Sequence, residues 1–192
     1  SHLWIYIAVS GLTKHYKAFF IMRSKDLSTL RIVDLWGFKS TKSNKRYIVE
    51  VEKFSNHFLG LKFYWKGVVN SKKRYSILTH DYEPRTIVMS CVYIMLEYFK
   101  KDNCASFGFV AAEDLIDSNS NQKGVNRRFR FYRRMMLSIF GSETLVQGYD
   151  SKNSIYLLIN KKMLETGVIS VNQIENEISR LYEGEYSLIL DR

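Results

Sequence analysis

The residues best suited to chemistry in this sequence are arginines crowded into one short segment, from position 126 to position 134. A guanidinium presents a planar fork of donors that matches the oxygens of a carboxylate or a phosphate. No acidic residue lies between Asp117 and Glu143, so the segment carries no counter-charge of its own. These residue types therefore predict an anion-binding site. Its arginines are Arg127, Arg128, Arg130, Arg133 and Arg134.

The spacing of apolar residues through this segment predicts a helix over about 125–140, because the steps are four, three, four and three residues. The buried stripe would be Val125, Phe129, Tyr132, Met136 and Ile139. The outer stripe would then carry Arg127, Arg130 and Arg134, with Arg128 and Arg133 beside it. Because the helix would begin after Gly124, its first amides could join the site. The candidate binding residues therefore also include Lys123 and Asn126.

Two other roles for these arginines stay open. They could pair with acidic residues of the same chain, either those at Glu113, Asp114 and Asp117 or those of the C-terminal tail. They could also form a charged face in water. Like charges three or four positions apart on a helix repel one another by about 0.2–0.5 kcal/mol per pair. An anionic partner would remove that cost.

The charge of the whole chain points to the same kind of partner. Lysine and arginine exceed aspartate and glutamate by 29 − 19 = +10. Residues 1–164 carry 27 − 13 = +14, whereas residues 165–192 carry 2 − 6 = −4. A positive body favours an anionic ligand such as nucleic acid. The acidic C-terminal part could fold over the basic body, or it could dock on a second copy and so cause self-association.

The elements that must position these residues follow from periodicity. Apolar residues alternate along 47–53 and 58–65, which predicts a hairpin with a turn at Ser55-Asn56, and 74–79 predicts a third strand. Weaker strand patterns cover 3–22 and 29–36, and they do not decide whether residues 1–46 join the core sheet. Pro84 and the apolar spacing after it predict a helix over 84–101, and the run 104–112 predicts a buried central strand.

The C-terminal third continues the pattern. Residues 144–149 and 155–159 predict a second hairpin, and Ser170 with Gln173 forms a capping box before a helix over 170–182. A short strand would follow at 186–190. The fold class is therefore α+β: a single domain over 1–192 with a mixed, largely antiparallel sheet. Residues 165–192 form the acidic C-terminal helix and strand of this domain.

Composition limits the classes of protein that remain. No segment reaches the roughly 18 apolar residues that a membrane span needs, so we expect no membrane partner and a cytoplasmic location. The two cysteines, Cys91 and Cys104, lie in apolar segments and favour buried free thiols. The four histidines are scattered, so we expect no metal site.

The order of elements over 47–162 resembles the core of the GNAT acyltransferases. Asn126 followed by Phe131-Tyr132 is similar to the pattern of that family's fourth helix, although its spacing is one residue shorter. The resemblance implies an acyl-CoA-dependent N-acyltransferase with acetyl-CoA as cofactor and Tyr132 as general acid; Glu113 or a water would be the base. One feature departs from the family: where its glycine-rich loop holds the CoA pyrophosphate, this chain has residues 80–86, which contain two carboxylates and no glycine.

The same region, 47–162, is also similar to small uncharacterised basic bacterial domains. These pair an apolar strand with an arginine-rich helix and end in a strand like residues 154–161, SIYLLINK. That likeness implies a fold and no activity. We therefore expect a non-catalytic binding module without a cofactor, in which the arginine-rich helix engages an anionic partner such as nucleic acid. The alternative is the GNAT-like acyltransferase.

Overall fold

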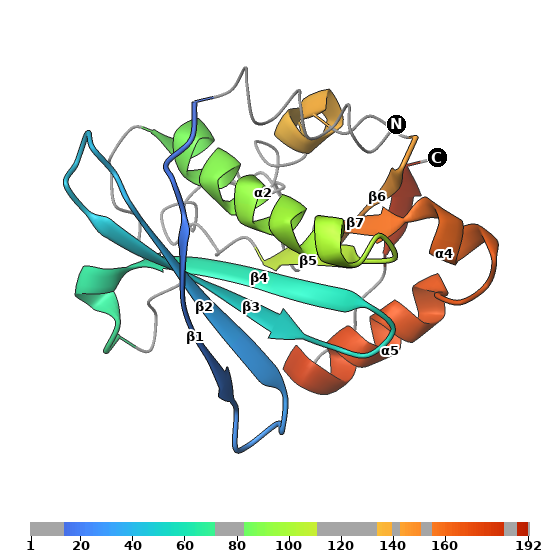
Figure 1. Ribbon diagram of the computed structural model, residues 1–192. Helices are drawn as coiled ribbons and strands as arrows, with labels where there is room; N and C mark the ends of the chain where they lie inside the picture. Colours follow the sequence, from blue (N-terminus) through green and yellow to red (C-terminus); the bar gives the residue numbers. More distant parts are fainter. Residues whose placement is uncertain are drawn as a thin grey trace, which may run out of the picture.

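The computed structural model describes residues 14–71, 83–110, 134–139, 143–150, 155–182 and 188–191. Within these ranges one sheet contains eight strands in the order β1-β2-β3-β4-β5-β7-β6-β8 (Figure 1). The strands are β1 (Phe19–Lys25), β2 (Ile32–Lys39), β3 (Arg46–Lys53), β4 (Phe58–Trp65), β5 (Ser106–Val110), β6 (Leu145–Asp150), β7 (Ile155–Asn160) and β8 (Ile189–Asp191).

The sheet is mixed and largely antiparallel. Strands β1 to β4 form an antiparallel meander, and β5, β7, β6 and β8 pair antiparallel with one another. Strands β4 and β5 are parallel, with Phe58 opposite Ser106 and Leu61 opposite Phe109. Parallel neighbours need a long crossover, which here includes helix α2 (Pro84–Lys101). These observations confirm the α+β class expected from the sequence.

Helix α2 covers one face of the sheet (Figure 1). The alternation in β3 places Tyr47, Val49 and Val51 on this face, where each is buried. Cys91 of the helix is also buried here, and burial raises the pKa of its thiol to about 12. The thiol is therefore neutral and part of the core. Helix α2 contributes the apolar stripe Ile87, Val88, Met89, Val92, Ile94, Met95, Leu96 and Phe99.

Helix α5 (Val171–Tyr182) packs on the opposite face, as Figure 1 shows. Its Ile174 and Ile178 join a second buried cluster that includes Phe58 of β4 and Leu157 of β7. The expected capping box is present: Gln173 N donates to Ser170 Oγ at 3.1 Å, and Ser170 N donates to Gln173 Oε1 at 3.1 Å. The apolar stripe of this helix is therefore used within its own chain.

Several expected elements are confirmed with small shifts in their ends. The hairpins 47–53/58–65 and 144–149/155–159 are β3–β4 and β6–β7, and the helix expected over 84–101 has those bounds. The central strand is shorter than expected, at Ser106–Val110, and the last strand begins at Ile189 rather than at 186. A short helix, α4 (Lys161–Glu165), and a 3₁₀ turn, η1 (Lys66–Val68), were not expected.

The N-terminal part of the chain resolves a question that periodicity left open. Strands β1 and β2 join the core sheet next to β3, so residues 19–39 belong to it. The apolar run 3–9 and the strand expected at 74–79 lie outside the described residues. Of the helix expected over 125–140, only 134–139 is described, and it is helical. Met136 is buried there as expected, and Met135 is buried as well.

Candidate functional site

Six cations gather at one end of the β1–β4 half of the sheet. Strand β2 ends there, β3 begins there, β4 ends there and α2 begins there. Residues 14–71 as a whole carry 12 − 4 = +8. Among the described residues 39–47, 65–71 and 83–86 the one acid is Glu83, which is buried. We call this group the basic edge; it consists of Lys39, Lys42, Lys45, Arg46, Lys66 and Arg85.

Two relationships describe the cations of the basic edge. Lys39 and Arg46 are direct register partners on neighbouring strands. Like charges opposite one another on a sheet destabilise it, so the fold accepts a cost at this position. Lys45 Nζ lies 4.8 Å from the centre of the Trp65 ring, a cation–π contact. The basic edge therefore combines positive charge with an aromatic side chain.

A buried polar network lies behind the basic edge and fixes its elements together. Tyr16 Oη donates to Glu83 Oε2 at 2.5 Å, and the Ser40 hydroxyl donates to the other carboxylate oxygen. Ser40 is the residue after β2, and Glu83 is the N-cap residue of α2. Tyr16 N also donates to Ser90 Oγ of α2 at 2.8 Å. A carboxylate of the chain itself thus lies at the start of α2, next to Pro84, which has no amide hydrogen.

A cleft of about 650 Å³ lies at the opposite end of the same strands, where β3 ends, β4 begins and α2 ends. Its walls are aromatic: Phe20 packs edge-on against Trp36 with ring centres 5.6 Å apart, and Trp36 packs against Tyr98 at 6.0 Å. Phe54 lines it from the β3–β4 turn, and Phe58 lines it from the start of β4. Such a volume and such walls are typical of small-molecule sites.

One wall of the cleft is held by a carboxylate, Asp34, which is 1% exposed. Arg23 donates to it twice, Nε to Oδ1 at 2.7 Å and Nη2 to Oδ2 at 3.0 Å. Tyr98 Oη donates to Oδ2 at 2.6 Å and accepts from Trp36 Nε1 at 2.8 Å. Burial pushes the pKa of Asp34 upward, but the hydrogen bonds from Arg23 and Tyr98 outweigh it and the pKa is lowered. Burial, with the bond to Asp34, raises the pKa of Tyr98.

A histidine–aspartate pair stands at the mouth of the cleft. His57 Nδ1 lies 2.6 Å from Asp102 Oδ2, and a carboxylate only accepts, so Nδ1 is the donor. Asp102 is itself held, because its Oδ1 accepts from Cys104 N at 3.0 Å. Both side chains are partly exposed, 48% for His57 and 40% for Asp102. The pair therefore presents an oriented imidazole to the cleft.

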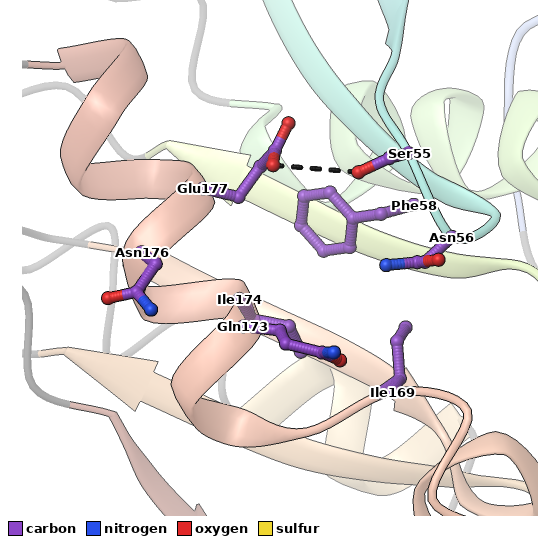
Figure 2. Close-up of a pocket in the computed structure, with 8 residues that line it drawn as sticks. All are labelled: Ser55, Asn56, Phe58, Ile169, Gln173, Ile174, Asn176 and Glu177. Carbon is purple, nitrogen blue, oxygen red and sulfur yellow. Dashed lines mark hydrogen bonds between the residues drawn. The ribbon is translucent and has the colours of Figure 1, made fainter.

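A second depression lies on the other face of the sheet, between the β3–β4 turn and α5 (Figure 2). Its volume is about 270 Å³, and Phe58, Ile169 and Ile174 line it. Figure 2 shows Ser55 Oγ and Glu177 Oε2 facing one another across it, with the oxygens 3.5 Å apart. Its one acid is thus turned toward the chain's own serine, and it holds no cation. It offers a ligand less chemistry than the basic edge or the cleft.

Most site residues expected from the sequence lie outside the described residues: Lys123, Asn126, Arg127, Arg128, Arg130 and Arg133, with Glu113 and Tyr132 of the acyltransferase alternative. Arg134 is described; it is helical and exposed, as expected for the outer stripe. The arginine-rich helix as an anion site therefore stays a prediction.

The residues that sequence reasoning missed are those of the cleft, above all His57, Asp102, Asp34 and Tyr98. His57 was counted among scattered histidines, and only the turn places it beside the end of α2. One signal was present: a histidine directly follows Asn56 in a hairpin turn, at a position that favours glycine. In the sequence, Lys42, Lys45 and Arg46 form a short charged segment, and nothing in it shows which other strand ends lie beside it.

Neither protein-family models, nor curated proteins, nor solved structures gave a match to this chain. Within the described ranges no three histidine, cysteine, aspartate or glutamate side chains are grouped as a metal site would require. No described helix is both long enough and apolar enough to cross a membrane.

Proposed function

We propose that this protein is a binding module for an anionic partner, most directly a nucleic acid, and that the basic edge makes the contact. The observation that carries the proposal is the opposition of Lys39 and Arg46 within a group of six cations. Like charges opposite one another on a sheet lower its stability. An anion bound between them would attract both and so offset their repulsion. A face that only had to be solvated would gain nothing from this arrangement.

The chemistry of the basic edge fits phosphates. Lysine and arginine at strand ends and in the turn 40–45 can reach a phosphate backbone, which supplies most of the affinity in non-specific nucleic-acid binding. Trp65 lies under Lys45 and against Gly67, so its ring holds the lysine in place at this edge. The arginines of the segment 126–134 would add to the same electrostatic attraction if their helix lies near this end of the sheet.

Salt dependence of binding tests the proposal. Fluorescence anisotropy with a labelled single-stranded RNA and a labelled duplex DNA would give the affinity at several salt concentrations. If about six phosphates are neutralised, the affinity should fall by about 10³-fold between roughly 50 and 200 mM salt, because counterions are released on binding. An affinity that does not change with salt, or no binding at low salt, would contradict the proposal.

A second candidate is the acyl-CoA-dependent transferase implied by the resemblance to the GNAT enzymes. What supports it is the order of elements: β4 and β5 are parallel, joined through α2, and the β6–β7 hairpin follows. What weighs against it is Glu83, a buried carboxylate at the start of α2, where a CoA pyrophosphate would need amide donors. Acetyl-CoA that raises the melting temperature at a salt concentration where nucleic acid no longer binds would favour this candidate.

A further inference from the structure

We infer that the aromatic cleft is a second binding site, for a small planar ligand that carries an acid group, and that His57 is the residue that holds the acid. The cleft lies at the far end of α2 from the basic edge. An 18-residue helix is about 27 Å long, so the two sites are separate. The inference does not depend on the proposed nucleic-acid binding.

The first argument is the backbone at His57. Asn56 and His57 have φ values of 55° and 61°, both in the left-handed region. The turn is closed by Phe58 N, which donates to Ser55 O at 3.2 Å, and two central residues with positive φ are the mark of a type I′ turn. Glycine is favoured after asparagine in such turns because a Cβ is strained there. A histidine at this position therefore lowers the stability of the turn relative to glycine. We attribute its presence there to a role of the imidazole.

The second argument is the way the ring is held. Asp102 fixes Nδ1, and its other oxygen is tied to Cys104 N, so neither partner is free to turn. The backbone oxygen of His57 accepts from Ser106 N at 3.0 Å, which fixes the turn to β5. In an imidazolium both nitrogens donate, so Nε2, on the opposite side of the ring from Asp102, is then the donor left for an acid group. A group that is oriented this firmly binds with little loss of conformational entropy.

The third argument is the charge balance of the cleft. Its three acids are already engaged: Asp34 by Arg23 and Tyr98, Asp102 by His57, and Glu97 by Lys100 at 3.0 Å. The cations Lys53 and Lys101 also line the cleft; Lys53 Nζ lies 5.9 Å from the centre of the Tyr98 ring, and Lys101 directly precedes Asp102 in the chain. An acid group near Nε2 would lie among these cations. The planar part of the ligand would pack against Phe20 and Trp36.

Carboxylate and phosphate share this chemistry, so the test uses both. Isothermal titration calorimetry would compare indole-3-acetate and phenyl phosphate with indole-3-ethanol, a neutral analogue of the first. With the imidazole in its protonated form, the acid should bind at least about tenfold more tightly than the alcohol, because Nε2 then donates a charge-assisted hydrogen bond to it. The tighter of the two acids identifies the preferred group. Equal affinity of acid and alcohol, or no binding of any probe at millimolar concentration, would overturn the inference.

A matched pair of variants separates recognition from folding. His57→Gly removes the imidazole but suits the left-handed backbone, so we expect an unchanged or higher melting temperature together with an affinity at least about tenfold lower. Asn56→Gly makes the same backbone change in the same turn and should bind like the wild type. Wild-type affinity in His57→Gly would overturn the role of the ring. Removing Lys39 and Arg46 should leave binding in the cleft unchanged.

Discussion

Tyr98, near the C-terminal end of α2, donates a 2.6 Å hydrogen bond to Asp34, the third residue of β2, from a position 64 residues later in the chain. This bond joins the helix to the sheet at the wall of the cleft. Arg23 of β1 donates to the same carboxylate. A carboxylate 1% exposed is thereby kept ionised inside the fold. The stability of this half of the protein should depend on it.

Removing the charge of Asp34 tests that dependence. In Asp34→Asn the guanidinium of Arg23 loses its counter-charge. The asparagine NH₂ group, which only donates, also replaces an oxygen that accepted from Arg23 or Tyr98. We expect a loss of about 1–3 kcal/mol in the free energy of unfolding, measured with urea. Glu97→Gln is the control, because its pair with Lys100 is solvent-exposed and should be worth less than about 0.5 kcal/mol. Equal losses in both variants would contradict the role of Asp34.

The lowered pKa of Asp34 predicts that the free energy of unfolding decreases at acid pH; we call this part of the pH profile the acid limb. Burial acts to raise the pKa of Asp34, the bonds from Arg23 and Tyr98 more than offset it, and the folded-state pKa is lower than the usual value of 3.8. The stabilising contribution is therefore present above pH 3.8 and is lost as the pH falls through the folded-state pKa. Urea unfolding followed over pH should show a flatter acid limb in Asp34→Asn than in the wild type. Parallel curves would show that other groups dominate.

The raised pKa of Tyr98 predicts that the free energy of unfolding decreases at alkaline pH; we call this part of the pH profile the alkaline limb. Burial and the bond to Asp34 raise the pKa of its hydroxyl above 10 in the folded state. Its contribution to stability is therefore complete below pH 10 and declines as the pH rises above that value. Tyr98→Phe should flatten this limb while it also lowers stability at neutral pH, since Asp34 and Trp36 both lose a partner. An alkaline limb that persists unchanged in Tyr98→Phe would contradict this assignment.

The network behind the basic edge should matter in the same way. Tyr16→Phe removes one of the two hydroxyl donors to the buried Glu83 carboxylate. We expect the free energy of unfolding to fall by about 1–3 kcal/mol, because a buried carboxylate is left partly unsatisfied. Tyr16→Phe combined with Glu83→Gln should recover part of the loss, since the amide needs fewer donors than the carboxylate. Additive losses in the double variant would argue against a direct coupling.

Much of the fold follows from local pattern. Tyr47, Val49 and Val51 alternate because the strand buries one face on α2, and that period is visible in the sequence. Pro84 starts α2, and the Ser170–Gln173 capping box starts α5, because both act within one turn of the chain. The strand order, with β5 between β4 and β7, could not be read in this way, since it depends on contacts between distant segments.

The candidate sites depend even more on distant contacts. His57 and Asp102 are 45 residues apart, and Lys39, Lys66 and Arg85 come together only because three strand ends and a helix start meet. Periodicity reports which face of an element is buried, but it does not report which elements are neighbours. Charge composition predicted an anionic partner for the chain as a whole, and the sheet topology supplied a second place where that partner could bind.

The most direct test of the proposed function compares two variants that lose the same charge. Lys39→Gln/Arg46→Gln removes the opposed pair of the basic edge, and Lys25→Gln/Lys101→Gln removes two exposed cations from the other end. Because the opposed charges repel, the first variant should be at least as stable as the wild type. The account predicts that it binds single-stranded RNA or duplex DNA at least about tenfold more weakly, with a salt slope reduced by about two, while the second stays close to the wild type. Equal weakening in both variants would mean that net charge, and not the basic edge, attracts the partner.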